Sequence, residues 1–403
     1  MKTYFLRAFA LIAYSVFSLW GAVAARAEGI DVVSVSAAGP GGSIVLGIRA
    51  AETDAAAALF DIRDATQKFI TYFLTGLALP SEVFWVNLNP HQPNSIIDQR
   101  LQNTLVGRIL LEGDLRLKKD AGMLTNPRLS DAGKRYWQRL YAKAESLGIA
   151  DQIPVINRIW IIPGEMSFHQ TATSLEIGQG ILHIRLESDY IGKKPAAVSA
   201  RLAAVQAYGV ELMRELILPL LEMKVNYDPA YADLRSVYRA LSLARWYKKQ
   251  CGGLSADQCA RLLKDCAAGS GKERVYRAYM ESLRNGEYNL TEETSSKLEV
   301  YLEVITRRYF SGGIDFRSDM LASNTNARQP GVYANYLAAV PLSRFQSLPA
   351  LLKSFRLVKV TAAHKQEAGL AIEDLPPLYR VSTPEPALRI EDLAVQRMSQ
   401  KSL

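Results

Sequence analysis

The sequence predicts an α+β fold, with a mixed N-terminal half of short strands and helices and a mostly helical C-terminal half. Two β-branched runs, Ile30–Ser36 and Ser43–Ile48, flank the glycine-rich turn Gly39-Pro40-Gly41-Gly42, as neighbouring strands do. From Pro195 onward, apolar residues instead recur every three or four positions, which indicates amphipathic helices. Strands and helices do not alternate regularly, which argues against a doubly wound parallel sheet.

Local signals predict the remaining elements of the N-terminal half. Ser130 is a suitable N-cap and Gly148 a suitable stop for one helix, and Pro80 lies just beyond the end of another. We expect helices at Ala51–Leu77, Leu101–Asp120 and Ser130–Leu147, and strands at Glu82–Leu88 and Pro154–Pro163. The alternating segment Met166–Asp189 is expected to turn at Gly178-Gln179-Gly180.

The sequence pattern of the C-terminal half predicts a succession of helices. The first carries a wide apolar stripe formed by Val198, Leu202, Val205, Leu212, Leu216 and Leu220. Pro219 is expected to kink or end this helix near Glu215, whose carbonyl loses its donor. Ser255 is a suitable cap for a short helix. The expected helices are Ala230–Lys249, Ala256–Ala267, Lys272–Leu283 and Thr291–Tyr309, and Phe355–Val360 is an expected late strand.

These signals divide the chain into five regions. Residues 1–27 form a signal peptide, 28–190 a mixed α+β region and 191–315 a helical region with a disulfide-stapled loop. Residues 316–370 form an irregular region that contains the late strand. Residues 371–403 are polar and spaced by prolines, so we expect an extended or disordered tail.

The composition is that of a globular protein. Of 403 residues, 49% are hydrophobic, 22% are charged and three are cysteine, which excludes wholesale disorder, collagen-like repeats and a disulfide-dense small scaffold. There are 48 Lys and Arg residues against 40 Asp and Glu residues. Because this excess is small and spread along the chain, we expect no nucleic-acid partner.

The first residues have the organisation of a secretory signal peptide. Lys2 and Arg7 form a positive n-region, and an apolar stretch ends in the small residues Ala25 and Ala27. We expect cleavage between Ala27 and Glu28. The alternative is an uncleaved membrane anchor, because the apolar stretch is near the lower length limit for crossing a bilayer. The mature chain is then exported, periplasmic or extracellular, and has no stable membrane span.

The three cysteines, Cys251, Cys259 and Cys266, lie close together between helices. Neighbouring cysteines usually pair in an oxidising compartment. Cys259 and Cys266 fall on one expected helix, about 10.5 Å apart, whereas the Cα atoms of a disulfide lie roughly 4.4–6.8 Å apart. We therefore expect Cys251 to pair with Cys259 or with Cys266, leaving one free thiol. A redox or metal site is the alternative.

Two of the four histidines, His169 and His183, fall on polar faces of the alternating segment. A turn centred near Glu176 is expected to bring them opposite each other. A metal site with Glu165 or Glu187 is one interpretation. The other is a solvated sheet face, which explains the pattern without any ligand.

Four polar residues are candidate ligand-binding residues. Asn87, Asn89 and Asp98 lie in the loop after the expected strand Glu82–Leu88, where such side chains close the turn or bind a ligand. The fourth, Arg108, belongs to the densely charged helix that follows this loop.

That helix carries opposite charges four residues apart. Arg108–Glu112, Glu112–Arg116 and Asp114–Lys118 predict a ladder of salt bridges on the helix surface. A carboxylate pair for hydrolysis is disfavoured here, because Glu112 and Asp114 point about 200° apart on a helix.

Known chemical motifs are incomplete or missing, so no cofactor is expected. Gly269-Ser270-Gly271-Lys272 has the end of a phosphate-binding loop, but Cys266 replaces its first glycine and Glu273 replaces the Ser or Thr that holds magnesium. We expect a flexible loop at the start of a helix. The chain has no Gly-x-Ser-x-Gly, His-Glu-x-x-His or EF-hand pattern.

A series of short motifs runs from Leu79 to Gln250. They are WVNL at Trp85–Leu88, GRILL at Gly107–Leu111, WIIPG at Trp160–Gly164, RELILP at Arg214–Pro219 and LRxVY…LAxWYK at Leu234–Lys248. In order and spacing, the series resembles an uncharacterised family of exported bacterial proteins. That family has no established activity, so the resemblance implies a bacterial source and an export-linked role, and it assigns no catalytic residue.

Two functions follow as hypotheses. The first is a non-enzymatic binding or scaffolding protein of the cell envelope or extracellular space, with an envelope or extracellular protein as partner. It agrees with the missing nucleophile–base set and with 19 tyrosines suited to protein contacts. The alternative is a hydrolase of cell-wall or extracellular polymers that uses an unrecognised carboxylate pair. A concave pocket with two carboxyls of raised pKa favours the enzyme, and a flat apolar patch favours the binder.

Overall fold

The computed structural model describes residues 30–37, 43–51, 55–79, 84–90, 92–149, 158–170, 174–191, 199–265, 271–285, 287, 311–316, 333–342 and 346–359. Four expected features lie outside these ranges: the signal peptide at 1–27, the turn at Gly39-Pro40-Gly41-Gly42, the helix at Thr291–Tyr309 and the tail at 371–403.

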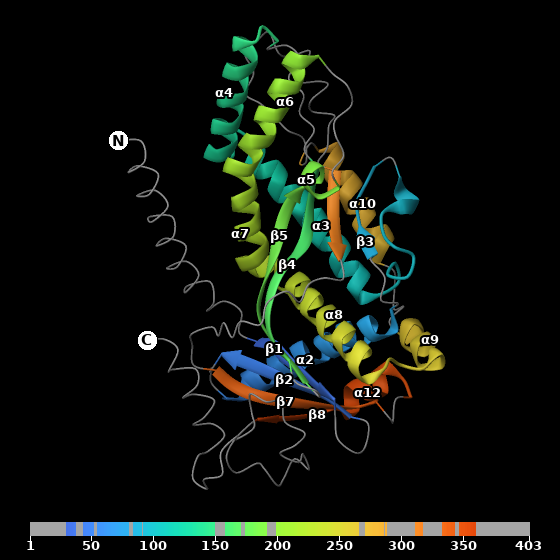
Figure 1. The fold of residues 1–403 in the computed structure, drawn as a ribbon. Helices are drawn as coiled ribbons and strands as arrows, with labels where there is room; N and C mark the ends of the chain where they lie inside the picture. The colour runs from blue at the N-terminus through green and yellow to red at the C-terminus, as the bar shows by residue number, and fades with distance from the viewer. Residues whose placement is uncertain are drawn as a thin grey trace.

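The described strands form an eight-stranded sheet in the order β3-β6-β4-β5-β1-β2-β7-β8. They are β1 (Ile30–Ala37), β2 (Ser43–Ala51), β3 (Phe84–Val86), β4 (Arg158–Gln170), β5 (Ser174–Leu186), β6 (Ser311–Phe316), β7 (Tyr333–Pro341) and β8 (Arg356–Lys359). All neighbours are antiparallel except β4 and β6, which are parallel. Figure 1 shows the long β4–β5 pair rising away from β1, β2, β7 and β8.

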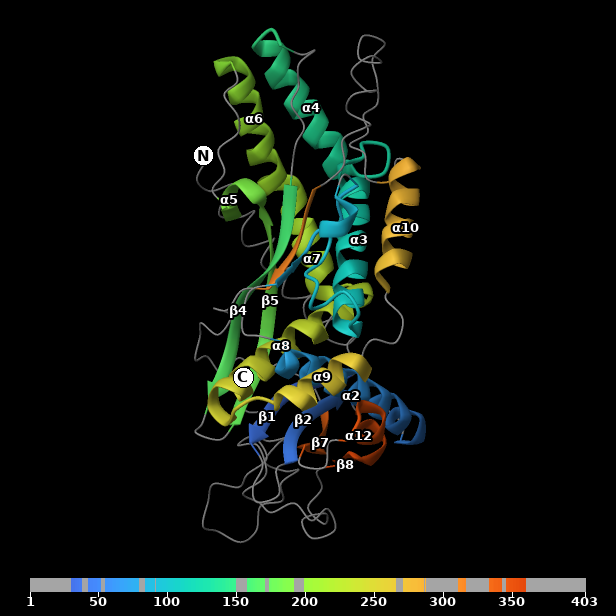
Figure 2. The ribbon, with the colours of Figure 1, turned by 90° about the vertical axis from the view of Figure 1, so that its right-hand side faces the viewer.

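Helices cover one side of this sheet. They are α2 (Ala55–Ala78), α3 (Leu105–Thr125), α4 (Asp131–Ser146), α5 (Glu187–Ile191), α6 (Ala200–Leu212), α7 (Leu218–Tyr227), α8 (Ala232–Cys251), α9 (Ala256–Asp265), α10 (Gly271–Arg284) and α12 (Leu348–Ser354). Short 3₁₀ turns occupy Pro93–Ser95 and Pro229–Tyr231. Figure 2 shows α2, α8 and α9 above β1 and β2, with α3 and α7 beside β4 and β5.

The predicted α+β class is confirmed. The expected strands at Ile30–Ser36, Ser43–Ile48 and Phe355–Val360 correspond to β1, β2 and β8. Strands also come from parts of the C-terminal half where we expected none: β6, and β7 in the region expected to be irregular. β7 pairs with β2 along its whole length, from Ser43↔Pro341 to Ala51↔Tyr333.

The caps predicted for two helices are confirmed. The Ser130 hydroxyl accepts the N–H groups of Ala132 (3.2 Å) and Gly133 (3.4 Å) at the start of α4. Gly148, just beyond the end of α4, has φ = +67°, a conformation that favours glycine. At the start of α9, Ser255 accepts the N–H of Gln258 (3.3 Å), whose side chain accepts the N–H of Ser255 in return (2.9 Å).

The turn predicted at Gly178-Gln179-Gly180 is wrong, because these residues lie inside β5. Gly164 and Gly180 instead allow β4 and β5 to approach each other closely, and they form no turn. A Cβ at Gly164 would lie 2.5 Å from the Ile181 carbonyl oxygen, and a Cβ at Gly180 would lie 2.8 Å from Met166 Cε. The register of β4 against β5 also shifts between Pro163 and Met166, so the strands bend here without separating.

Pro219 reshapes its helix without ending it. A π-helical segment, Met213–Ile217, joins α6 to α7, and the Leu218 N–H bonds to the carbonyl of Met213, five residues earlier. The wider π turn accommodates a proline that cannot donate to Glu215, so a continuous but irregular helical run spans 200–227.

The central helix of the core is α8, which packs against α2, α3, β1 and β5. Its apolar residues at helical spacing are buried: Leu234, Val237, Tyr238, Leu241 and Ala244. Arg235 and Arg239 of the same helix are buried as well. The Arg235 guanidinium donates to the carbonyls of Val225 (2.7 Å) and Asp228 (3.0 Å), which ties α8 to the end of α7.

Within the described part of the chain, no helix has the length and apolar character needed to cross a membrane.

Candidate functional site

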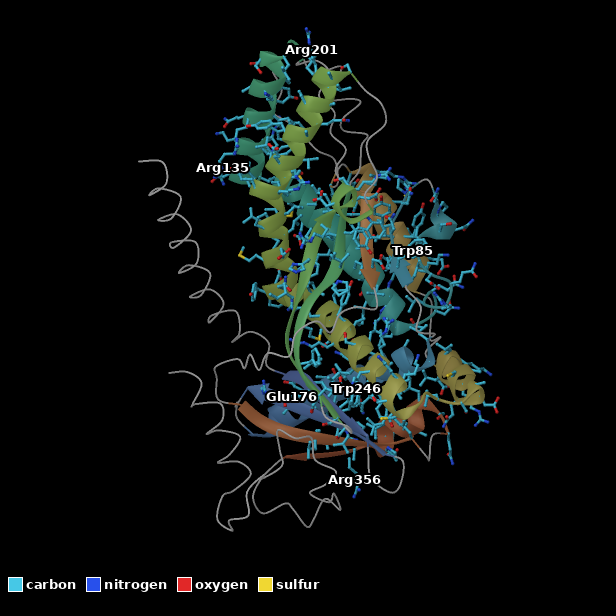
Figure 3. All side chains as sticks on the ribbon, in the orientation of Figure 1. Trp85, Arg135, Glu176, Arg201, Trp246 and Arg356 are labelled. Atoms are coloured by element: carbon cyan, nitrogen blue, oxygen red, sulfur yellow. The ribbon has the colours of Figure 1, made fainter. Side chains whose placement is uncertain are left out.

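The loop that carries Asn87, Asn89 and Asp98 is closed by backbone hydrogen bonds. The Asn87 N–H donates to the Ile96 carbonyl (2.9 Å), and the Asp98 N–H donates to the Trp85 carbonyl (3.2 Å). The Asn89 carbonyl accepts a further N–H from within the loop. These bonds fix the loop as a compact extension of β3, which lies at the edge of the sheet. Figure 3 shows Trp85 there, at the rim of the molecule.

Asp98 stabilises the loop through Arg100. Its Oδ1 accepts the Arg100 backbone N–H (3.0 Å) and the Nε–H (2.9 Å). These bonds hold the pKa of the Asp98 carboxyl below its usual value, although partial burial acts in the opposite direction. Asp98 is thus a turn-closing residue, the first of the two roles that the sequence allowed.

A buried ion pair lies under the same loop. Asp114 of α3 accepts the Leu88 N–H (2.7 Å) and both of its oxygens contact Lys118 Nζ, at 2.8 and 2.9 Å. Burial raises the pKa of the Asp114 carboxyl and lowers that of the Lys118 ammonium despite their attraction. The expectation of a surface ladder is therefore wrong for this pair, which faces the core and fixes α3 against the β3 loop.

Arg108 does not join the other three candidates. Its guanidinium lies 3.7 Å from Glu112 on the same helix, as the ladder predicted. Its aliphatic stem packs against Gly271 at the start of α10, where a Cβ would lie 2.4 Å from Arg108 Cγ. Arg108 therefore contributes to the contact between α3 and α10.

The two histidines are not opposite each other, so that expectation is wrong. His169 pairs with Glu176 and His183 pairs with Ile162 in the β4–β5 register. The ring of His183 instead meets α7, where its Nδ1 lies 3.2 Å from Glu222 Oε1. Among the described residues, no group of three His, Cys, Asp or Glu side chains is arranged to hold a metal ion.

Side chains of α7 satisfy the backbone of β5 along the edge opposite β4, beyond the residues that pair with β1. The Leu182 N–H donates to Asn226 Oδ1 (2.9 Å) and its carbonyl accepts Asn226 Nδ2–H (2.8 Å). The Ile184 N–H donates to Glu222 Oε2 (3.0 Å). β1 pairs with β5 only at residues 174–176, so Asn226 and Glu222 substitute for a neighbouring strand farther along.

The predicted Cys251–Cys259 disulfide is not formed, because both residues are free thiols. Cys251 is the exposed last residue of α8, after which Gly252 (φ = +84°) redirects the chain. The Cys259 thiol lies 3.8 Å from the Leu254 carbonyl, at the start of its own helix. Cys266, the other expected partner of Cys251, lies outside the described residues.

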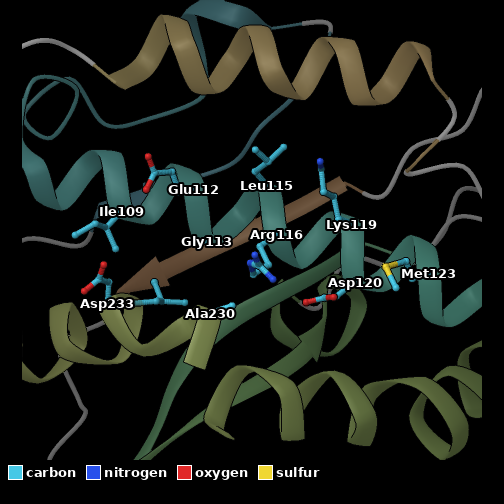
Figure 4. A pocket seen from close by; sticks show the side chains of 11 residues that line it. Ile109, Glu112, Gly113, Leu115, Arg116, Lys119, Asp120, Met123, Ala230 and Asp233 are labelled. Carbon is cyan, nitrogen blue, oxygen red and sulfur yellow. The ribbon is translucent and has the colours of Figure 1, made fainter. Parts of the chain in front are cut away.

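A cavity of about 430 Å³ lies between α3 and the start of α8 (Figure 4). Its volume is within the range of small-molecule sites, about 300–1,000 Å³. The lining residues of α3 are Ile109, Glu112, Gly113, Leu115, Arg116, Lys119, Asp120 and Met123, and those at the start of α8 are Ala230, Asp233 and Leu234. We call this space the α3–α8 cavity.

Asp120 forms a fixed part of the cavity wall. Its Oδ1 accepts from Lys224 of α7 (2.9 Å) and its Oδ2 accepts from the Tyr231 hydroxyl (2.8 Å). Burial, together with the nearby Asp120 charge, raises the pKa of Tyr231 well above its ordinary value. Tyr231 is therefore a permanent donor, and this triad holds the start of α8 against α3 and α7.

Two other charged groups of the wall are also engaged. Glu112 Oε1 lies 3.7 Å from Arg108 Nε in an ion pair and accepts from Arg274 of α10 (3.4 Å). Lys119 Nζ lies 3.0 Å from Glu287 Oε2. These pairs link α3 to α10 and to the residues that follow it.

Arg116 and Asp233 remain available in the cavity. Among the described residues, neither side chain makes a hydrogen bond or an ion pair. The Arg116 guanidinium lies over the Tyr231 ring, 6.0 Å from its centroid, which holds it at the wall. Figure 4 shows Asp233 at the Ile109 end of the cavity and Arg116 farther along α3.

The sequence did not predict this site. Arg116 was interpreted only as a member of the charged ladder, and Asp233 was not singled out. The one available signal was the density of charge on α3. Asp120, Lys224 and Tyr231 are far apart in the chain, so only the packing of α3, α7 and α8 brings them together.

Comparisons with protein-family models, curated proteins and solved structures find no match to this chain.

Proposed function

We propose that this chain is an exported bacterial protein that binds a small ligand in the α3–α8 cavity and catalyses no reaction on it. One observation carries the proposal. Within the part of the chain that the structure describes, the cavity presents a cation without an ion-pair partner, Arg116, and an anion without one, Asp233, among apolar residues, while the other charges on its wall are paired. A few polar groups aimed into a largely apolar hollow are the usual make-up of a ligand site.

The carboxyl groups support binding over hydrolysis. Hydrolysis by a carboxylate pair needs two free carboxyl groups facing one cleft, one of them with a raised pKa. Asp114 has the raised pKa, but its side chain is 0% exposed and engaged by Lys118. In the cavity itself, Asp120 and Glu112 accept from cationic side chains, which leaves Asp233 as the single unengaged carboxyl among the described lining residues.

A small ligand is better supported than a protein partner. The exposed large apolar side chains among the described residues are Trp85, Met123, Leu129 and Ile181. These four side chains, from β3, α3, the α3–α4 turn and β5, are few for the contiguous apolar patch that marks a docking surface. Met123 is different, because it lines the cavity.

Location in the envelope or outside the cell rests on the leader sequence. Lys2, Arg7 and the Ala25–Ala27 exit are the supporting features. A ligand would accordingly be a molecule of the periplasm or of the medium.

The test is retention of a low-molecular-weight molecule from envelope extract. The protein lacking residues 1–27 is incubated with the low-molecular-weight fraction, washed and examined by native mass spectrometry. We expect a retained mass with the unmodified protein and none with Ala230→Trp, whose indole would fill the cavity. Ala142→Trp, at an exposed position of α4, is the matched control and should retain the molecule.

Two results would contradict the proposal. One is retention by Ala230→Trp equal to that of the unmodified protein, and the other is no retained mass at all. Recovery of a cleaved form of the molecule would instead support the hydrolase alternative.

A further inference from the structure

We infer that the α3–α8 cavity takes a short peptide of about two or three residues with free ends, its carboxylate at Arg116 and its ammonium at Asp233. The inference rests on the proposed function and names the chemical class of its ligand. The residue spacing that sets this length follows below.

The two unengaged charges require a ligand with both signs. A purely anionic ligand at Arg116 would leave Asp233 uncompensated and would lie near Asp120 and Glu112, which also line the cavity. A purely cationic ligand at Asp233 would meet Arg116 and Lys119 in the same way. Like charges brought together in a partly desolvated site are unfavourable. A zwitterion satisfies both groups at once.

The neighbours of Asp233 leave its carboxylate available. Lys68 of α2 is close enough for Asp233 to contribute to the raised pKa of its ammonium. That ammonium is held by Asp64, however, with Nζ and Oδ2 2.9 Å apart. Asp233 therefore influences Lys68 without being neutralised by a direct pair.

The geometry of Arg116 suits a carboxylate. A guanidinium binds a carboxylate through two parallel hydrogen bonds, and a group already held over an aromatic ring loses less freedom on binding. The Tyr231 ring provides that support, and Tyr231 is itself fixed by Asp120.

The length of α3 along the cavity wall, from Ile109 to Arg116, sets the length of the ligand. Asp233 lies near the Ile109 end of the cavity in Figure 4, where α3 runs across the view. Ile109 and Arg116 are seven residues apart on α3, which corresponds to about 10.5 Å along the helix axis. An extended peptide spans roughly 3.3–3.6 Å per residue, so two or three residues bridge this separation.

The wall between the charges suits an apolar side chain. Ile109, Leu115, Met123 and Leu234 supply the apolar lining. Met123 is 51% exposed, and its flexible thioether can adapt to side chains of different shape. We therefore expect a middle residue such as leucine to bind better than glycine.

The test is calorimetric titration of the protein lacking residues 1–27 with four forms of the tripeptide Ala-Leu-Ala. The first form has both ends free, the second has an acetylated N-terminus and the third an amidated C-terminus. The fourth is blocked at both ends. Gly-Gly-Gly with free ends tests the apolar wall. Since a hydrogen bond to a charged group contributes about 1.5–3 kcal/mol, blocking either end should weaken binding at least about tenfold.

Two variants of the protein test which cavity residue binds which end of the peptide. Arg116→Gln should bind the free and amidated peptides equally, and Asp233→Asn should bind the free and acetylated peptides equally. Each should keep its sensitivity to the other end. Lys134→Gln and Asp131→Asn, exposed on α4, are matched controls and should behave like the unmodified protein. Because both cavity residues are exposed, thermal unfolding of the variants should be unchanged.

Equal binding of the doubly blocked peptide would overturn the inference, as would a variant that weakens all four peptides alike. If no peptide binds but envelope extract still yields a molecule retained through the cavity, the peptide assignment is wrong and the proposed function stands. If neither occurs, both are wrong.

Discussion

Lys118 donates to both carboxylate oxygens of Asp114 in a part of the core where their side chains are 2% and 0% exposed. The same spacing of four residues occurs on α2, where Asp64 and Lys68 pair at the surface with side chains 52% and 50% exposed. One sequence pattern thus gives a buried pair and an exposed pair in the same molecule.

Lys118→Met should destabilise the protein by about 3–5 kcal/mol, because it leaves a buried carboxylate without its counter-charge. The double variant Asp114→Asn with Lys118→Met should recover much of this loss, since the amide oxygen still accepts the Leu88 N–H. Lys68→Met is the matched control and should cost less than about 1 kcal/mol. Urea unfolding measures all three. Equal costs for Lys118→Met and Lys68→Met would refute the burial argument.

Asn226→Ala should cost about 1–3 kcal/mol, because it leaves the Leu182 N–H and carbonyl of β5 without partners. Amide hydrogen exchange gives the sharper readout. The Leu182 amide should lose protection, while amides of β2 should not. Asn285→Ala, at an exposed position after α10, should leave both the stability and the exchange pattern unchanged.

Arg100→Gln should lower the free energy of unfolding by about 1 kcal/mol at neutral pH, and by less in acid. The Arg100 hydrogen bonds lower the pKa of Asp98 in the folded state, so Asp98 contributes stability above its unfolded pKa of about 3.9. That contribution is lost as the pH falls through the lower, folded pKa. The difference between the variant and the unmodified protein should therefore be constant near pH 7 and shrink below about pH 4.

Free energies of unfolding, measured for both proteins across this pH range, show whether the stability difference shrinks or grows in acid. Arg201→Gln, an exposed position of α6, should show no such narrowing. A difference that widens in acid would contradict the role given to Arg100.

Thiol counting under denaturing, non-reducing conditions should find three free thiols in each chain. Cys251 and Cys259 are both free thiols, and the sequence contains one further cysteine, Cys266. One thiol in each chain would restore the disulfide predicted from the sequence.

Features set by short-range interactions could be predicted from the sequence. Ser130 and Ser255 bond within one helical turn, so their identity alone indicates where α4 and α9 begin. The kink at Pro219 follows from its missing N–H in the same way, although the sequence does not specify a π turn.

Features set by distant partners could not be predicted. β7 contains three alanines and little β-branched sequence, and it is a strand because β2 provides partners along its full length. Gly178 and Gly180 have the residue type of a turn, but Gly180 serves contact with Met166. The candidate site has the same origin, because Arg116 and Asp233 share a cavity only after α3 and α8 pack together.

The pairing of β2 with β7 has a consequence for biogenesis. A strand near the beginning of the chain forms its ladder with one made close to the end, so the sheet cannot be completed while the C-terminus is still being synthesised. Contacts this distant in the chain also form slowly. Such an order of events leaves the edge of β2 that faces β7 unpaired until β7 has been made.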